Sequence, residues 1–422
     1  METQKFPKMI KVKQNFGPHT SIGNVYVAVK GEIEDILPST EMKPGDSVAI
    51  TVGSRGIANL TEIVRAIVDV LKSWECKPFL VPAMGSHGGA TAEGQVEVLA
   101  HYGITEDDIG VPIKSSMDVE EVGKTEDGLS VFVDKNALSA DHIVVFNRVK
   151  PHTDFRGDVE SGLLKMMTIG LGKHKGAMYY HQAAVKLSGP RVIRTVGRAV
   201  IRNCPVAFGL AVVENAYDET AIVSALLPQD IETEEGKLLT KAKEIMAKLP
   251  FQEMDLLIVD RMGKNISGTG MDTNVVGRVM NIYTPEPEWP KITRIFVRDL
   301  TEETGGNAIG IGMADFTTKR LVDKINWDAT YTNAVTGLVV EKARLPVVCK
   351  NDREALETAL KTVGLVSPDE AKIVWIRDTL SLEEIMISEA FLPFAKGTSN
   401  LEVRGEPKEF AFDESGDLVN DL

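Results

Sequence analysis

The feature that most constrains the fold is a strand, a glycine-rich loop and a helix that occur twice in succession near the N-terminus. The apolar run 47–52 (SVAITV) ends in the loop GSRG, and residues 59–74 carry apolar side chains at helical spacing. The apolar run 78–84 (PFLVPAM) follows, with the loop GSHGG at 85–89 and a helix predicted over 92–101. This repeated order predicts βαβ units, and therefore a parallel sheet with helices packed on it.

Later apolar runs predict that this sheet continues and that a second α/β domain follows. Continuation of the sheet is expected at residues 129–133, 142–147, 205–214 and 221–227. A polar helix at about 231–249, closed by Pro250, separates these runs from a second series, with strands expected at 255–260, 294–300, 307–316, 346–350 and 372–378 and a helix at 352–363. We therefore expect an α/β protein with two α/β domains: residues 1–250, with a mainly parallel sheet and the cofactor-binding and catalytic residues, and a smaller domain over residues 251–422. The acidic tail after Asn400 is expected to be mostly solvated.

The composition excludes several classes of protein. The chain has 47 basic and 61 acidic residues and a net charge of −14, which argues against nucleic-acid binding but leaves room for a small anionic substrate in a local basic pocket. The three cysteines are far apart and form no CxxC motif, so they indicate neither a disulfide framework nor a cysteine zinc site. No apolar run of about 18 residues spans a membrane, and the N-terminus lacks a secretory apolar core, so we expect a soluble cytoplasmic protein without membrane partners.

Chemically reactive side chains follow the predicted strands. Ligands of open parallel sheets bind at the carboxyl ends of the strands, where loops offer backbone N–H groups. Arg55 and His87 lie between glycines in the two loops, and His152 follows the strand predicted at 142–147. Lys165 lies in the apolar sequence GLLKMM, a setting that lowers a lysine pKa and favours a nucleophilic amine. The alternatives are structural: an arginine paired locally at a helix start, and a lysine that extends from a buried helix to solvent.

Four of the seven histidines, His87, His152, His174 and His181, fall on this loop system. Such clustering indicates a metal or proton-transfer site. The sequence GLGKHKGA at 170–177 also places basic residues among glycines, a pattern suited to binding a phosphate.

Together these motifs resemble the nickel-dependent lactate racemase family, over most of the chain. The resemblance implies a nickel pincer cofactor, Ni(II)-pyridinium-3,5-bisthiocarboxylic acid mononucleotide, joined covalently to Lys165 of GLLK. His181, sixteen residues further on, then matches the nickel ligand, and His87 and His152 match the two acid/base histidines. Arg55 matches the arginine that binds the substrate carboxylate, and Arg55, Ser86 and Gly88 are expected to contact the cofactor.

Two positions depart from the lactate-specific members of that family. The position three residues before Arg55, an aspartate in those members, is Val52 here, and the interval from His152 to Lys165 is longer. In the second domain, polar residues follow the strand at 255–260 (Lys264, Asn265, Asp272, Asn274 and Arg278), without the lactate pattern. We expect Lys264 and Arg278 to contact a substrate that is a 2-hydroxy acid other than lactate.

The resemblance implies a racemase or epimerase that inverts the C2 carbinol by proton-coupled hydride transfer, with cofactor-synthesis proteins as partners. Two alternatives from other classes remain: a metal-dependent hydrolase that uses the same histidines, and a non-catalytic protein that binds a nucleotide-like anion. A Rossmann dehydrogenase is disfavoured because neither glycine loop reads GxGxxG.

Overall fold

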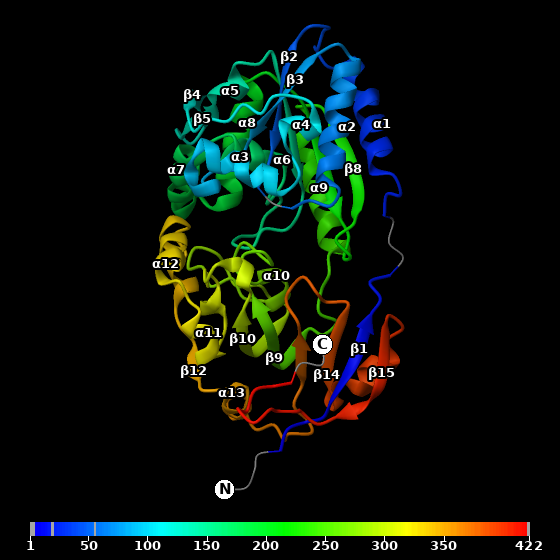
Figure 1. Cartoon of the computed structure of the whole chain (residues 1–422), viewed down its shortest axis with the longest axis vertical. Coiled ribbons are helices and arrows are strands. Elements are labelled where there is room, and N and C mark those ends of the chain that lie inside the picture. The colour runs from blue at the N-terminus through cyan, green and yellow to red at the C-terminus, as the bar shows by residue number, and fades with distance from the viewer. Residues whose placement is uncertain (1–4, 18–20, 55, 420–422) are drawn as a thin grey trace. The chain divides into compact units, whose positions relative to one another are not determined.

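The computed structural model describes all residues except 1–4, 18–20, 55 and 420–422. The chain divides into an N-terminal unit, residues 19–246, and a C-terminal unit, residues 1–18 with 247–422. Each unit has its own sheet flanked by helices (Figure 1), so the expected α/β class with two α/β domains is confirmed. The division after residue 246 lies close to our boundary at 250, but the N-terminal segment joins the C-terminal unit. The reason is that strand β1 (Met9–Gln14) pairs with β14 (Glu384–Ser388) and β15 (Leu401–Lys408).

The N-terminal unit is built on a five-stranded sheet in the order β3-β2-β6-β7-β8. Its strands are β2 (Ser47–Val52), β3 (Lys77–Pro82), β6 (His142–Arg148), β7 (Val206–Glu214) and β8 (Thr220–Leu226). All neighbours are parallel except β8, which pairs antiparallel with β7. The run Val48–Val52 is buried throughout, as expected for a parallel strand covered on both faces.

Helices cover both faces of this sheet, and each face has its own apolar core. One core joins the sheet to α1 (Val25–Ile36), α2 (Leu60–Ser73), α3 (Ala92–His101) and α4 (Glu106–Ile109). The other joins it to α5 (Lys135–Leu138), α6 (Leu163–Lys165), α7 (Lys173–Leu187), α8 (Gly189–Asn203) and α9 (Ile231–Ile245). The doubly covered sheet leaves the loops at its strand ends as the places where a ligand can approach the backbone.

The run at 129–133 does not extend the main sheet, contrary to our prediction. It forms β5 (Ser130–Asp134), which pairs antiparallel with β4 (Val119–Lys124) in a separate two-stranded sheet. A tight turn causes this pairing, because Gly128 adopts a φ of +79° and its amide donates to the carbonyl oxygen of Thr125 (3.0 Å). The two strands are therefore joined locally.

The C-terminal unit contains an eight-stranded mixed sheet in the order β12-β11-β10-β9-β13-β14-β1-β15. From β12 to β13, neighbouring strands are parallel. From β13 to β15, neighbouring strands are antiparallel. The strands of this sheet not yet given bounds are β9 (Glu253–Met262), β10 (Lys291–Leu300), β11 (Phe316–Thr318), β12 (Val347–Cys349) and β13 (Ile373–Ile376). The helices of this unit are α10 (Thr273–Val276), α11 (Lys319–Asp323), α12 (Trp327–Thr336), α13 (Asp352–Leu360) and α14 (Leu392–Gly397).

The strand expected at 307–316 is wrong for most of its length. Only Phe316–Thr318 is a strand, and Ile311–Met313 forms a 3-10 turn. Gly310 has a φ of +99°, and a Cβ there would lie 1.8 Å from the carbonyl oxygen of Thr269. A backbone that approaches another segment so closely needs glycine and cannot continue as a regular strand.

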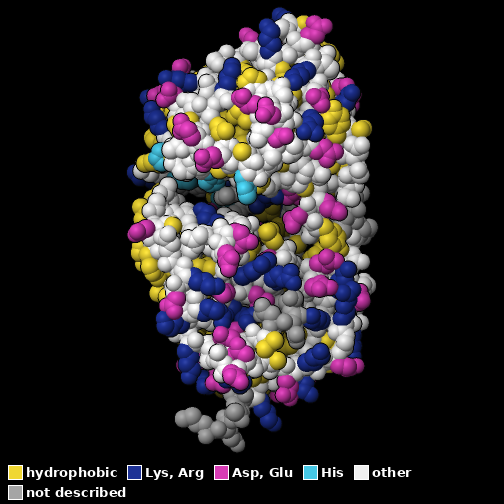
Figure 2. Space-filling model, in the orientation of Figure 1, with side chains coloured by type: hydrophobic (Ala, Val, Ile, Leu, Met, Phe, Trp, Pro, Cys, Tyr) yellow, Lys and Arg dark blue, Asp and Glu magenta, His cyan; other side chains and the backbone are white. Residues whose placement is uncertain are grey.

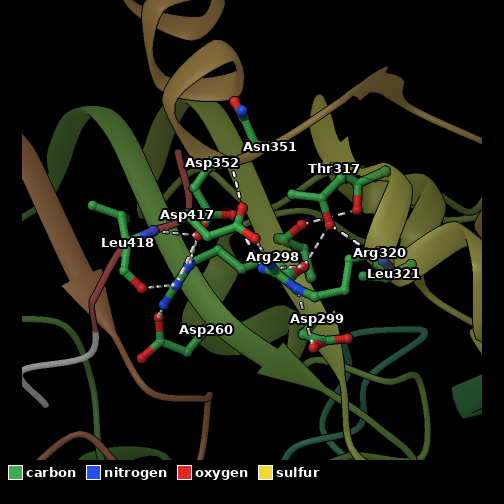
Figure 3. A network of polar contacts seen from close by, with 12 residues as sticks. Asp260, Arg298, Asp299, Thr317, Arg320, Leu321, Asn351, Asp352, Asp417 and Leu418 are labelled. Carbon is green, nitrogen blue, oxygen red and sulfur yellow. Dashed lines mark hydrogen bonds and ion pairs between the residues drawn. The ribbon is translucent and has the colours of Figure 1, made fainter. Parts of the chain in front are cut away.

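Most described residues of the acidic tail are exposed, as expected, but its end packs on the C-terminal unit. Figure 3 shows how its last described residues join a buried polar network. Arg298, which is 5% exposed, pairs with Asp352 (2.7 Å) and donates to the carbonyl oxygen of Leu418 (2.8 Å). Asp417 pairs with Arg320 (2.6 Å). The end of the tail therefore binds Arg320 of α11 through a carboxylate and Arg298 of β10 through a backbone carbonyl. None of the helices described combines the length and apolar character that a bilayer-spanning segment needs.

Candidate functional site

Three predicted site loops leave the same edge of the parallel sheet in the N-terminal unit. The strands β3, β2 and β6 are neighbours in the sheet and run in the same direction. Their carboxyl ends lead into the GSHGG loop at 85–89, the GSRG loop at 53–56 and the loop that carries His152. The order of the strands thus places these loops beside one another. Figure 2 shows histidine side chains gathered along one margin of this unit.

Glycine is required where the loop carrying His87 crosses the start of α3. Gly88 has a φ of +65°, and a Cβ there would lie 2.5 Å from the carbonyl carbon of Gly94. His87 and its neighbours Ser86 and Gly88 are half-buried. Nδ1 of His87 is hydrogen-bonded to Oγ of Ser54. Because a hydroxyl both donates and accepts, this contact allows Nε2 of His87 to act either as a base or as an acid.

A cavity of about 650 Å³ adjoins His87. Its lining combines the two loops with one face of α3, and comprises Ser54, His87, Gly88, Gly89, Thr91, Glu93, Gly94, Glu97, Val98, His101 and Tyr102. The imidazole therefore lies beside a space large enough for a small polar ligand.

A buried polar chain supports the backbone on either side of His87. Nε2 of Gln95, which is fully buried, donates to the carbonyl oxygens of Gly85 (3.0 Å) and His87 (3.3 Å). Nζ of Lys173 donates to Oε1 of Gln95 (2.9 Å) and pairs with Asp134 (3.3 Å). Burial lowers the pKa of Lys173 and raises that of Asp134, and the attraction between the two opposes both shifts.

This finding corrects the phosphate-binding interpretation of GLGKHKGA. The Lys173 side chain is fully buried and bound to Gln95 and Asp134, so it faces the protein interior and not a ligand. Lys175 is exposed, with Nζ 4.4 Å from the centre of the Phe132 ring.

The loop carrying His152 is held by its own backbone and by a buried glutamate. Nδ1 of His152 accepts a hydrogen bond from the Asp154 amide (3.0 Å), and the ring stacks on Phe155 with centroids 3.9 Å apart. The buried carboxylate of Glu160 accepts from the amides of His152 (2.6 Å) and Gly157 (3.0 Å), and pairs with Lys243 of α9 (2.6 Å). Because Nδ1 accepts, the neutral His152 ring carries its proton on Nε2 and presents a donor.

Lys165 lies at the end of the short helix α6, and its side chain is half-buried between buried apolar neighbours. Its Nζ donates to Oγ of Ser161 (3.3 Å). A π-helix, Met166–Gly170, follows it directly. Such π-turns are rare and frequently occur at functional sites, where they change the direction of the following side chains.

The segment from Lys165 to His181 packs against the glycine loops. A Cβ at Gly85 would lie 3.1 Å from Cγ2 of Ile169 and 3.5 Å from Cβ of Ala177, and a Cβ at Gly53 would lie 3.1 Å from Cε of Met166. The structure thus brings the loops, the π-helix and α7, which carries His181, together.

His174 lies on the same helix as His181. Its Nδ1 is buried and has no hydrogen-bond partner among the described residues. A buried ring nitrogen without a partner is uncommon, and is available to a group bound beside α7.

Some predicted site residues lie elsewhere. Arg55 lies outside the described residues, and Val52 is buried within β2. Lys264 belongs to the C-terminal unit, where its Nζ donates to Asn333. Arg278, in the same unit, pairs with Asp315 (2.7 Å) and donates to the carbonyl oxygens of Met313, Ile292 and Thr293 (2.9–3.0 Å). These contacts give Arg278 a role in holding the fold, and the proposal below does not depend on it.

Sequence reasoning missed the polar residues that support the site: Gln95, Asp134, Glu160, Glu235 and Lys243. A signal existed for Glu235, because it lies in the apolar stripe of α9 with Ile231, Leu239 and Ala242. No comparable signal marks the others. Among the described residues, no group of three or more His, Cys, Asp and Glu side chains is arranged to hold a metal ion.

Comparison with known proteins gives a family match in the N-terminal unit and similar folds among solved structures. Residues 34–191 match the family described as the lactate racemase N-terminal domain, a range that contains His87, His152, Lys165 and His181. No curated protein sequence matches the chain.

The lactate racemase apoprotein from Thermoanaerobacterium thermosaccharolyticum is similar in fold. It is 15% identical, with a TM-score of 0.52 over 89% of this chain and 99% of that one. A crystal structure of a protein from Thermotoga maritima is 13% identical, with a TM-score of 0.53 over 85% of this chain and 96% of that one. At these identities the similarity shows the fold alone.

Proposed function

We propose that this chain, whose residues 34–191 match the lactate racemase N-terminal domain, is a racemase or epimerase of a 2-hydroxy acid that uses a lysine-tethered nickel pincer cofactor. The observation that carries the proposal is the arrangement at the sheet edge. The loops with His87 and His152 leave neighbouring parallel strands, and the segment from Lys165 to His181 packs against the first of them.

The residues at this edge fit such a cofactor. Lys165 offers a half-buried amine at the end of α6, suited to the covalent attachment. His181 on α7 offers an imidazole, a ligand type that suits nickel. Nδ1 of His174, which has no hydrogen-bond partner among the residues that the structure describes, is a polar atom that a bound group can satisfy. Glycines at positions 85 and 88 allow the backbone to approach closely, and Ser86 supplies a hydroxyl beside them.

The chemistry that this group supplies when bound is reversible uptake of a hydride from the carbon that bears the substrate hydroxyl. The protein's own residues move the proton. His87 Nε2 removes the hydroxyl proton, in the state in which Nδ1–H donates to Ser54, and the substrate becomes a 2-keto acid. In its imidazolium form, which requires Nδ1 to release the Asp154 amide, His152 would donate the Nε2 proton to the oxygen as the hydride is returned to the opposite face, and would be left neutral. In the reverse direction the two histidines exchange roles.

We propose that Arg55 in the GSRG loop holds the substrate carboxylate through charge-assisted hydrogen bonds. The presence of Val52 in place of an aspartate, and the different polar sequence after β9, support a 2-hydroxy acid other than lactate. We also propose a cytoplasmic location, where proteins that synthesise the cofactor would be its partners.

The test is a panel of single-enantiomer 2-hydroxy acids, incubated in deuterated water with cofactor-loaded protein and followed by chiral analysis. The expected result is inversion at C2 with the α-hydrogen retained, because a hydride held by a cofactor does not exchange with solvent. His87→Ala should abolish inversion and keep nickel, whereas His181→Ala should lose nickel.

Three results would contradict the proposal. Equal loss of nickel in both variants would refute the assigned roles. Zinc in place of nickel, with hydrolysis of an ester or amide, would favour the metal-dependent hydrolase. Binding of a nucleotide-like anion without turnover of any hydroxy acid would favour the non-catalytic alternative.

A further inference from the structure

A buried carboxylate lies directly beneath the segment that carries Lys165. Glu235 belongs to α9 and is only 1% exposed, although it is a charged residue. It occupies the position of an apolar residue in the buried stripe of the helix, between Ile231 and Leu239. A leucine would fill this position without the cost of removing a charge from water, so the carboxylate has no evident role in stabilising α9 itself.

Its contacts are made to the backbone just before Lys165. The Leu164 amide donates to Oε2 of Glu235 (3.0 Å), and both carboxylate oxygens lie against Gly162, where a Cβ would be 2.5 Å from Cδ of Glu235. From the other side, Nδ2 of Asn147 donates to the carbonyl oxygen of Gly162 (2.7 Å). The backbone from Gly162 to Leu164 is thus hydrogen-bonded on one side to Asn147 at the end of β6 and on the other to Glu235 of α9.

Burial of the Glu235 carboxylate costs free energy, and two observations show this cost. Burial raises the pKa of Glu235 to about 7, and its Oε1 has no hydrogen-bond partner among the described residues. Glu235 stays buried despite this cost, and it contacts Leu164, the residue before Lys165. We therefore expect that its role is to hold this backbone in position.

We propose that Glu235 is a positioning residue of the site: it fixes the backbone from Gly162 to Leu164 and so sets the direction in which Lys165 presents its amine for attachment of the cofactor. The role of Lys165 in this inference rests on the proposed function. The effect of Glu235 on the backbone does not, and it is measurable in the protein without cofactor.

Three substitutions separate position from charge. Glu235→Gln keeps an oxygen at the same reach and removes the charge. Glu235→Asp keeps a carboxylate that falls short of the Leu164 amide, and Glu235→Leu removes the acceptor altogether. Glu234→Gln is the matched control, because Glu234 lies on the exposed side of the same helix and pairs with Lys237 (2.7 Å).

Two readouts apply to each variant of the full chain. The first is hydrogen exchange at the Leu164 amide in apoprotein, which should become about tenfold faster in Glu235→Asp and Glu235→Leu than in wild type, since the amide loses a buried acceptor. The second is the fraction of chains with covalently added cofactor, from intact mass after production in a host that makes it. This fraction should fall about tenfold or more in the same two variants and be retained in Glu235→Gln and Glu234→Gln.

The outcomes distinguish this inference from the proposed function. If wild type carries no covalent cofactor, the proposed function fails, and the exchange data still decide whether Glu235 holds the segment. If wild type carries it and Glu235→Asp carries as much, with the Leu164 amide equally protected, the inference fails while the proposed function stands. If Glu235→Gln loses the cofactor as completely as Glu235→Asp, an oxygen at the right position is not sufficient, and the inference is equally refuted. Should Glu235→Leu fail to fold, the comparison of Gln with Asp gives the same decision.

Discussion

Replacing Lys173 by methionine should destabilise the N-terminal unit strongly, because it leaves a buried charge without its partner. Lys173 and Asp134 are both fully buried, 3.3 Å apart, and Met fills a similar volume, so the change removes the ammonium and little packing. Asp134 then keeps the hydrogen bond from the Ala137 amide (2.8 Å) as its main stabilising contact. Breaking a buried pair in this way costs about 3–5 kcal/mol of unfolding free energy.

The loss of unfolding free energy in Lys173→Met should also depend on pH, and the titration of Asp134 determines whether it grows or shrinks as the pH rises. Burial already raises the pKa of this carboxyl, and Lys173 opposes that shift, so its removal raises the pKa further. A carboxyl whose pKa is raised on folding contributes stability at low pH that is lost as the pH rises through the raised value. Urea unfolding at pH 5 and pH 8 should therefore show the larger loss at pH 8.

Two controls make the prediction refutable. Lys175→Met changes an exposed lysine on the same helix and should cost less than about 1 kcal/mol. Adding Asp134→Asn to Lys173→Met should recover most of the lost stability, because it removes the uncompensated charge and keeps an oxygen for the Ala137 amide. A loss under about 1 kcal/mol in Lys173→Met, or no recovery in the double variant, would show that the pair is not the buried charge network described here.

Three further predictions concern other parts of the chain. Glu235→Gln should remove a fall in wild-type stability on the order of 3 kcal/mol between about pH 4.5 and 7, where the unfolded carboxyl is already charged and the buried one is not; parallel urea titrations of both proteins measure it, and equal slopes would contradict it. Gly89→Ala, with no atom within 4 Å of its Cβ, should cost about 1 kcal/mol for its positive φ, and Gly88→Ala several times more because its Cβ meets Gly94; similar melting temperatures would refute the close approach. Deleting residues 410–422 should cost about 3–5 kcal/mol, since it removes the tail's contacts with Arg298 and Arg320, and an unchanged unfolding curve would show that the tail does not stabilise the sheet.

Much of the fold could be predicted because its signals are local. The strand at 47–52 and the helix at 92–101 were predicted with the bounds that the structure shows, since an uninterrupted apolar run and a helical apolar spacing each lie within one segment. The run at 129–133 was correctly identified as a strand but assigned to the wrong sheet, because the choice of partner depends on the turn at Gly128 and on distant packing. The run at 307–316 failed because its glycines serve close backbone approaches, which an apolar pattern does not reveal.

The candidate site also has a part that local sequence predicts and a part that depends on distant contacts. The βαβ pattern predicts parallel strands, whose carboxyl ends share one edge of a sheet, and the loops that carry His87 and His152 follow two such strands. The groups that hold these loops could not be predicted, because Gln95 and Glu160 are themselves paired with lysines far away in the sequence, Lys173 and Lys243. For Lys173 the prediction from the sequence was wrong. A lysine among glycines suggests a phosphate ligand, but the structure pairs it with the buried Asp134.

Intact mass spectrometry of the chain, purified from a host that makes the pincer cofactor, tests the central claim most directly. The account predicts a protein heavier than its sequence, with nickel present and the added mass located on the peptide that contains Lys165. It predicts the same added mass in Lys175→Ala and none in Lys165→Ala. An unmodified chain without nickel, or an added mass that persists in Lys165→Ala, would contradict it.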